Sequence, residues 1–164
     1  MKALASLTLA LLLMLAGCSS TPRASDAGAE RAAPEVIGRL TLEQANDVTL
    51  YAISLVGTPY RYGGNTPESG FDCSGLIGHV YKSRAGVAAP RTVAQLVDWG
   101  QAVPAQSLRT GDLVVFTQNG VSNHAGIYVG EGRFVHAPST GGEVRLEPLN
   151  AKHWARMLIS YRRP

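Results

Sequence analysis

The 164-residue chain has few of the features that mark several common protein classes. It has only two cysteines, Cys18 and Cys73, so a framework of disulfide bonds is excluded. It has no lysine-rich run and no basic patch interleaved with aromatic residues, and its net charge is only +3, so we expect no nucleic-acid partner. Its longest apolar run, residues 3–16, is shorter than the roughly 20 residues that a transmembrane helix needs. These absences favour a domain that is stabilised by an ordinary hydrophobic core.

The amino-terminal apolar run has the features of a secretory signal. Lys2 gives it a basic start, and small residues end it in "LAGC", residues 15–18. This ending resembles the lipobox of bacterial lipoproteins, whose cysteine carries lipid and becomes the first residue of the mature chain. We expect a signal peptide at residues 1–17 and lipidation of Cys18; an incidental cysteine is the alternative. Ser19 after this cysteine resembles outer-membrane lipoproteins, which predicts anchoring in the outer membrane, facing the periplasm.

The rest of the chain divides into a tether and one domain. Residues 18–40 are small, polar and proline-containing, which is typical of a flexible linker. In the domain, residues 41–164, a capping box at Thr41 and Gln44 begins a helix that ends near Gly57. A second helix begins at Asp72, a good N-cap, and a short third one covers 92–99. Runs rich in Val, Ile, Phe and Tyr then predict strands at 112–116, 124–130, 133–137, 143–146 and 157–161. Helices followed by strands indicate an α+β fold with an antiparallel sheet.

Cys73 occupies the first turn of the second helix, where free backbone amides and the helix dipole favour a thiolate. The neighbouring Asp72 opposes this, but with a base close by we expect Cys73 to be mostly thiolate near neutral pH. Cys73 also precedes Leu76 and Ile77 by three and four positions, so its side chain should point at the sheet. The alternative is a small, buried, inert side chain.

His124 and His136 lie on two strands that flank the hairpin turn at residues 130–132. A three-residue turn pairs Gly126 with His136, and the period of two then places both histidines on one face of the sheet, about 7–8 Å apart. A two-residue turn would place them on opposite faces. We interpret His79 as a solvated helix residue and His153 as structural.

A helix start that faces a histidine-bearing sheet suggests a nucleophile, a base and an orienting group. A zinc site made by Cys73, His124 and His136 is the competing interpretation. The usual short pairs of zinc ligands are missing from the sequence, so we expect no metal and no cofactor.

Six segments of the chain, taken in order, resemble the motifs of the NlpC/P60 family of bacterial cell-wall cysteine peptidases: "TPYRYGG", "GFDCSGL", "PRT", "GDLVVF", "HAGIYVG" and "FVHAPS". The resemblance covers about residues 42–161. It implies a papain-like fold in which helices pack on an antiparallel sheet. It also implies that Cys73 is the nucleophile, His124 the base and His136 the third polar residue.

Four further residues match family positions around the nucleophile. The resemblance implies that Tyr60 lies at the active site, where its hydroxyl donates to the oxyanion or its ring packs. Asp72 and Ser74 flank the nucleophile and would contact charged groups of the substrate, with helix capping as the alternative role of Asp72. Arg91 would bind a carboxylate of the stem peptide or brace its loop.

The activity implied by the resemblance is hydrolysis of peptidoglycan stem peptides, typically between D-γ-glutamate and a diamino acid. An amidase or acyltransferase that uses the same triad is one alternative, and a wall-binding lipoprotein without turnover is another. The expected partners are therefore stem peptides and, through Cys18, a membrane, while a regulator or adaptor protein is left open.

Overall fold

A computed structural model describes residues 38–164 of the chain. The predicted signal peptide, the lipidation of Cys18 and most of the predicted tether lie outside these described residues. In the described part, no helix is both long enough and apolar enough to cross a membrane.

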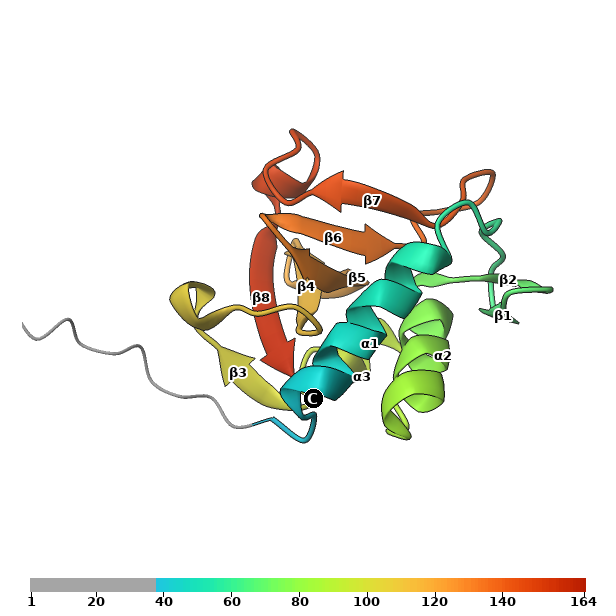
Figure 1. Ribbon diagram of the computed structural model, residues 1–164. Helices are drawn as coiled ribbons and strands as arrows, with labels where there is room; N and C mark the ends of the chain where they lie inside the picture. The colour runs from blue at the N-terminus through green and yellow to red at the C-terminus, as the bar shows by residue number, and fades with distance from the viewer. Residues whose placement is uncertain (1–37) are drawn as a thin grey trace, which may run out of the picture. The chain divides into compact units, whose positions relative to one another are not determined.

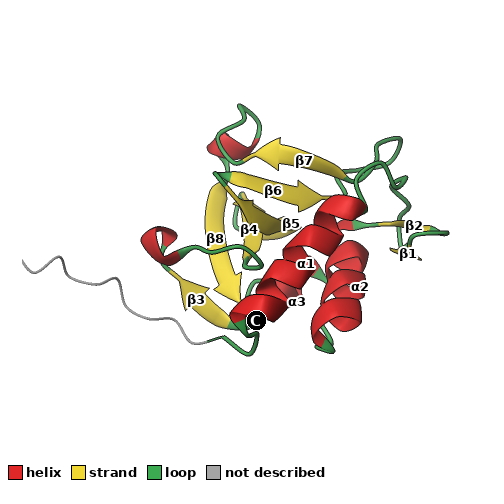
Figure 2. Ribbon diagram, in the orientation of Figure 1, coloured by secondary structure: helices red, strands yellow, loops and turns green. Residues whose placement is uncertain are grey.

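The described domain consists of three α-helices, two short 3₁₀ helices (Ala105–Ser107 and Trp154–Arg156), a six-stranded antiparallel sheet and a small two-stranded one (Figures 1 and 2). The helices and two short strands near them are α1 (Leu42–Ser54), β1 (Asn65–Thr66), β2 (Gly70–Phe71), α2 (Cys73–Ala85) and α3 (Val93–Leu96). Six strands form the main sheet in the order β3-β8-β4-β5-β6-β7: β3 (Gln101–Val103), β4 (Leu113–Gln118), β5 (Val121–Gly130), β6 (Arg133–His136), β7 (Arg145–Pro148) and β8 (Leu158–Arg163). The predicted α+β class is therefore confirmed.

Local signals account for where the helices begin. Thr41 and Gln44 exchange both bonds of the predicted capping box, at 3.0 and 3.1 Å. Asp72 caps α2 by accepting the Gly75 N–H, and Gly86 ends this helix in the left-handed conformation at φ 67°. The third helix is shorter than predicted, because only residues 93–96 are helical.

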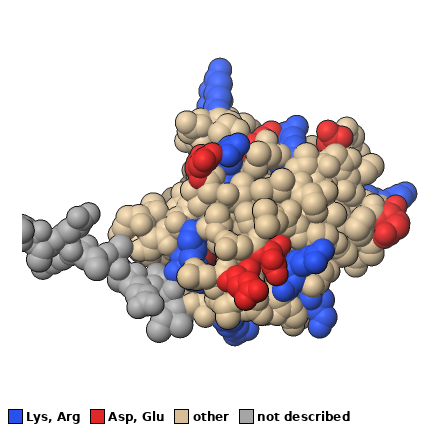
Figure 3. Space-filling model, viewed as in Figure 1, with Lys and Arg blue, Asp and Glu red and all other residues tan. Residues whose placement is uncertain are grey.

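Two apolar layers cover the two faces of the main sheet. The larger layer joins α1 and α2 to the sheet and includes Val48, Leu76, Val115 and Ile127. The smaller layer lies on the other face and contains Val114, Phe116, Phe134 and Trp154. Neighbouring residues of a strand point to opposite faces, so each central strand contributes to both layers. On the face shown in Figure 3, charged side chains of both signs are interspersed, without a large area of one sign.

The β5–β6 hairpin has the predicted register, but its turn differs from the predicted one. Its turn has two residues, Glu131 and Gly132, since Gly130 pairs with Arg133, and both turn residues have positive φ, as a type I′ turn requires. The predicted three-residue turn is therefore wrong. A bulge at Val129 compensates, because beyond it Tyr128 pairs with Phe134. The added residue returns both histidines to one face, as predicted.

Candidate active site

His124 and His136 are joined by a hydrogen bond of 2.7 Å between His124 Nε2 and His136 Nδ1. His124 is buried and His136 is fully buried. The Trp154 ring fixes both of them: it stacks on His124 with centroids 5.0 Å apart and meets His136 edge-on at 5.2 Å. The bond occupies Nε2 of His124, so Nδ1 is the nitrogen through which His124 can act on another group.

The two histidines lie on the face of the sheet that points away from the helices. His124 pairs with Phe116 across β4 and β5, and Phe116 belongs to the smaller apolar layer, whereas Ala125 belongs to the layer under the helices. Cys73 at the start of α2 therefore meets the histidine-bearing sheet, as predicted, but on the face opposite to the one from which the two histidine rings project.

The thiol instead meets β5 at the backbone beside His124. The backbone N–H of Ala125 is close enough to the Cys73 sulfur to lower the pKa of the thiol. Asn123, on the other side of His124, lines the same cleft as Cys73. In residues 38–164 the thiol and the His124 ring make no hydrogen bond, so transfer of the thiol proton to His124 requires one of the two side chains to move.

The surroundings of the thiol favour its neutral form at rest. Burial, followed by the charge of Asp72, raises the pKa of Cys73, and the amides of Ser74, Ala125 and Cys73 itself oppose this only in part. Burial, and then the neighbouring His136, lowers the pKa of His124 to about 3. This direction opposes the expected thiolate, because burial of the sulfur, which the sequence does not reveal, acts against the helix amides.

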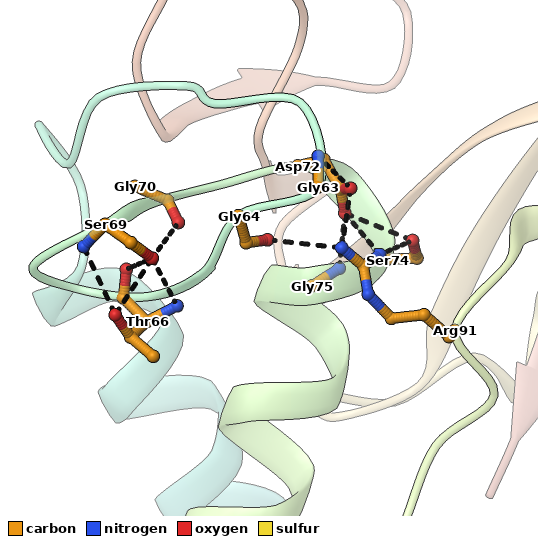
Figure 4. Close-up of polar contacts among 9 residues, drawn as sticks. All are labelled: Gly63, Gly64, Thr66, Ser69, Gly70, Asp72, Ser74, Gly75 and Arg91. Carbon is orange, nitrogen blue, oxygen red and sulfur yellow. Dashed lines mark hydrogen bonds and ion pairs between the residues drawn. The ribbon is translucent and has the colours of Figure 1, made fainter.

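Asp72 is the centre of a polar network at the start of α2 (Figure 4). Its carboxylate accepts the N–H groups of Gly75 at 2.7 Å and Gly63 at 2.9 Å. Arg91 reaches back from the loop after α2 and binds both carboxylate oxygens, at 2.7 and 2.8 Å. Burial alone would raise the pKa of Asp72, but the bonds from Arg91 and Gly75 outweigh it and lower this pKa. Asp72 therefore caps the helix and also binds a cation.

Arg91 has the loop-bracing role that was one of its two predicted roles. Its Nη1 also donates to Ser74 Oγ at 2.6 Å, and its Nη2 lies 3.5 Å from the Gly64 carbonyl oxygen. These contacts join the loop before α2 to the loop after it. The Arg91 side chain is still 45% exposed, so one part of it faces the cleft.

A cleft of about 460 Å³ opens beside the thiol. All the predicted site residues of the domain except the two histidines line it: Tyr60, Asp72, Cys73, Ser74 and Arg91. Burial, and then Cys73 and Asp72, raise the pKa of the Tyr60 phenol, which keeps its hydroxyl protonated and able to donate. Tyr62 and Asn123 also line the cleft and were missed, although Tyr62 lies only two residues after Tyr60 in "PYRYGG".

The other two histidines lie elsewhere. His79 is partly buried, with Nε2 2.9 Å from the Tyr51 hydroxyl and its ring 5.2 Å from that of Phe71, so the prediction that it is solvated is wrong. His153 packs edge-on against Trp154 at 4.5 Å, consistent with a structural role. Among the described residues, no three His, Cys, Asp or Glu side chains are grouped so that they could hold a metal ion.

Sequence reasoning missed a further residue, Glu147, which lies behind the histidine pair. Its Oε2 is 3.3 Å from Nε2 of His136 and also accepts the Trp154 indole N–H. Its Oε1 is 2.7 Å from Nε of Arg145. The pairing of β6 with β7 places Glu147 beside His136, because Glu147 lies opposite Phe134 in this pairing. The eight-residue connection between these strands contains no signal from which that register could be deduced.

Comparison with known proteins matches the chain to one family. The NlpC/P60 family matches residues 57–163. The chain is 41% identical over 112 residues to murein DD-endopeptidase MepH of Escherichia coli, covering 66% of this chain and 41% of MepH. It is 40% identical over 111 residues to gamma-DL-glutamyl hydrolase of Bacillus subtilis, covering 66% of this chain and 26% of that enzyme. The matched region spans less than half the length of either relative.

Solved structures show the same fold. An NlpC/P60 family protein from Bacillus cereus superimposes with a TM-score of 0.69 at 30% identity, over 80% of this chain and 41% of that one. The NlpC/p60 domain of the peptidoglycan hydrolase SagA gives a TM-score of 0.62 at 28% identity, over 71% of this chain and 96% of that domain. With the family match covering most of the described domain, the chain belongs to the NlpC/P60 family.

Proposed function

We propose that this chain is a cysteine peptidase that hydrolyses peptidoglycan stem peptides, with Cys73 as nucleophile, His124 as base and His136 as the group that orients the base. The observation that carries the proposal is the bond between His124 Nε2 and His136 Nδ1. It leaves Nδ1 of His124 available, next to the Ala125 amide that acts on the Cys73 sulfur. The names of the relatives, murein endopeptidase and glutamyl hydrolase, support the substrate class.

In this mechanism the reaction starts from a neutral thiol and a neutral imidazole. The Cys73 sulfur attacks the scissile carbonyl while its proton moves to Nδ1 of His124. His136 accepts the Nε2–H of His124 and so holds the ring and stabilises the imidazolium. His124 then gives the proton to the leaving amine, and water hydrolyses the thioester that remains on Cys73.

Two hydrogen-bond donors of the cleft can serve the oxyanion. The backbone N–H of Cys73 belongs to the first turn of α2, whose amides have no partner within the helix. The Tyr60 hydroxyl lines the same cleft and stays protonated. We assign these two groups to the oxyanion, since preorganised donors at that position contribute strongly to acyl transfer.

We propose the D-γ-glutamyl–diamino acid bond as the bond that is cut. The exposed part of Arg91 gives the cleft a positive group, which suits the carboxylates that a stem peptide carries. The names of the relatives point to different bonds, because MepH is called a DD-endopeptidase and the Bacillus enzyme a gamma-DL-glutamyl hydrolase. A D,D crosslink is therefore the second candidate.

Digestion of purified sacculi tests the proposal, with Cys73→Ala as the inactive control. Mass spectrometry of the products should show fragments cut after D-γ-glutamate from the wild type and none from Cys73→Ala. Separation of whole peptides from glycan would indicate an amidase, and new crosslinks would indicate an acyltransferase. Equal release by the two proteins, or none by either, would overturn the proposal. Near-stoichiometric zinc in the same sample would support a metal site instead.

We also propose that lipid on Cys18 anchors the protein in the outer membrane, facing the periplasm. The support is the position of "LAGC" at the end of the apolar run, with serine following it. Two or more acyl chains give stable anchoring where one does not. Cell fractionation should place the wild type in the outer membrane and Cys18→Ala in the soluble periplasm, and an identical distribution of the two would contradict lipidation.

A further inference from the structure

Behind the histidine pair lies a carboxylate that the proposed mechanism does not yet use. Glu147 of β7 is a diagonal neighbour of His136 on β6, since Phe134 pairs with Glu147 and His136 with Arg145. Its side chain is 22% exposed, whereas that of His136 is fully buried. The carboxylate therefore closes the buried end of the pair, opposite the end that faces the thiol.

The protons of the two rings are coupled through their shared bond. If His136 carries its proton on Nε2, then its Nδ1 accepts, His124 donates from Nε2, and Nδ1 of His124 is free to take a proton. If His136 carries its proton on Nδ1, then His124 accepts at Nε2 and carries its own proton on Nδ1. In that second arrangement His124 cannot act as a base toward the thiol.

Glu147 discriminates between these two arrangements. The buried Nε2 of His136 has no aligned hydrogen-bond partner in the described part of the chain, but Oε2 of Glu147 lies 3.3 Å from it. A proton on Nε2 faces this carboxylate favourably, whereas a lone pair there would face a second lone pair and a negative charge. We propose that Glu147 is a positioning residue that sets the tautomer of His136 and, through it, keeps His124 in the form that can accept the thiol proton.

The carboxylate is itself held in place. The Trp154 indole donates to the same Oε2, and Arg145 holds Oε1 at 2.7 Å. Trp154 also stacks on His124, so one ring fixes both the base and the carboxylate. Partners of this kind, which act on a histidine from its far side, are worth about 10- to 100-fold where the histidine binds a metal, and we expect a similar factor here.

The inference rests on the proposed function, but the tautomers can be measured without measuring peptide hydrolysis. Spectra of ¹⁵N-labelled histidine report which ring nitrogen carries the proton. In the wild type, both His124 and His136 should be protonated at Nε2. A wild-type His136 that is protonated at Nδ1 would overturn the proposal whatever the variants do.

Substitutions at Glu147, with one control substitution at Glu143, complete the test. Glu147→Ala should mix the tautomers and lower kcat on muropeptide about 10- to 100-fold with little change in KM, and Glu147→Leu replaces it if alanine prevents folding. Glu147→Gln keeps an oxygen that Trp154 can orient toward His136, so it should keep the tautomers and most of the turnover. Glu143→Ala removes an equal charge from an exposed position just before β7 and should behave as wild type.

The outcomes separate the two proposals. A loss of kcat in Glu147→Ala without any change of tautomer would overturn the positioning role. Turnover by Glu147→Ala equal to that by Glu143→Ala would overturn it as well. If the wild type itself has no activity on sacculi, the proposed function fails, while the tautomers of the wild type and variants still decide the role of Glu147.

Discussion

Replacing Asp72 with asparagine should lower the stability of the domain and at the same time make the Cys73 thiol more acidic. Asparagine caps helices as well as aspartate does, so the bond from the Gly75 N–H is kept. The negative charge that raises the pKa of Cys73 is removed. The same change takes one of the two carboxylate oxygens away from Arg91. Stability and thiol acidity therefore respond in opposite senses to one substitution.

The loss of stability follows from the contacts of the carboxylate. The Gly63 N–H loses an acceptor at 2.9 Å, which is worth about 1 kcal/mol. The ion pair with Arg91 adds at most about 1 kcal/mol, since the arginine side chain is 45% exposed and water screens the pair. Asp72→Asn should therefore cost about 1–2 kcal/mol, and Asp72→Ala about 2–3 kcal/mol because it also removes the cap.

Two measurements check this prediction. Urea unfolding gives the free energy of unfolding, and the rate of iodoacetamide labelling at Cys73 against pH, followed by peptide mass spectrometry, gives the titration of the thiol. The labelling curve of Asp72→Asn should move to lower pH. That of Arg91→Gln should move to higher pH, because the carboxylate is then no longer offset. Both variants lose stability, so a general loosening of the fold cannot produce opposite shifts. Coincident curves, or a shift of Asp72→Asn to higher pH, would refute the reasoning.

Three further predictions concern the sheet and the histidine pair. Gly126→Ala should cost about 1–3 kcal/mol, because the new Cβ would lie 2.6 Å from Phe134 Cδ2 and 2.8 Å from the Val135 oxygen; an unchanged urea midpoint would contradict the register. His136→Asn or His136→Gln should keep part of the muropeptide turnover, while His136→Ala should lose about 10² to 10⁴ of it; wild-type turnover by the alanine variant would remove His136 from the mechanism. The free energy of unfolding should fall as the pH drops from about 6.5 toward 3, since burial lowers the pKa of His124 and of His136 to about 3 and the unfolded chain then binds more protons than the folded one. As the pH drops, the urea midpoint of His136→Gln should fall less steeply than that of the wild type. Equal slopes of midpoint against pH in the two proteins would show that His136 does not cause the loss of stability.

Elements with local signals were predictable from the sequence. The capping box at Thr41 and Gln44, and Asp72 at the start of α2, depend on residues three positions apart, so their bonds can be recognised without tertiary structure. Strand β3 could not be recognised, because it is short, mostly exposed and exists only by pairing with β8 about 60 residues later. Strands β1 and β2 have two residues each and were missed for the same reason.

Residue type and spacing suggested Cys73, His124 and His136 as the members of the candidate site, and the predicted shared face of the two histidines was confirmed. That agreement depended on a bulge at Val129, which offsets a wrong turn length and leaves no mark in the sequence. The side of the sheet on which the histidines lie, the loss of water around the thiol and the contact with Glu147 all arise from long-range packing, which local patterns do not encode.

Titration of Cys73 by alkylation tests the central claim most directly. The protein is treated with increasing iodoacetamide, and the fraction of Cys73 that is modified, measured by peptide mass spectrometry separately from Cys18, is compared with the muropeptide turnover that remains. If Cys73 is the nucleophile, turnover should fall in direct proportion to the modified fraction and reach zero when modification is complete. Turnover that persists with Cys73 fully alkylated would contradict the account.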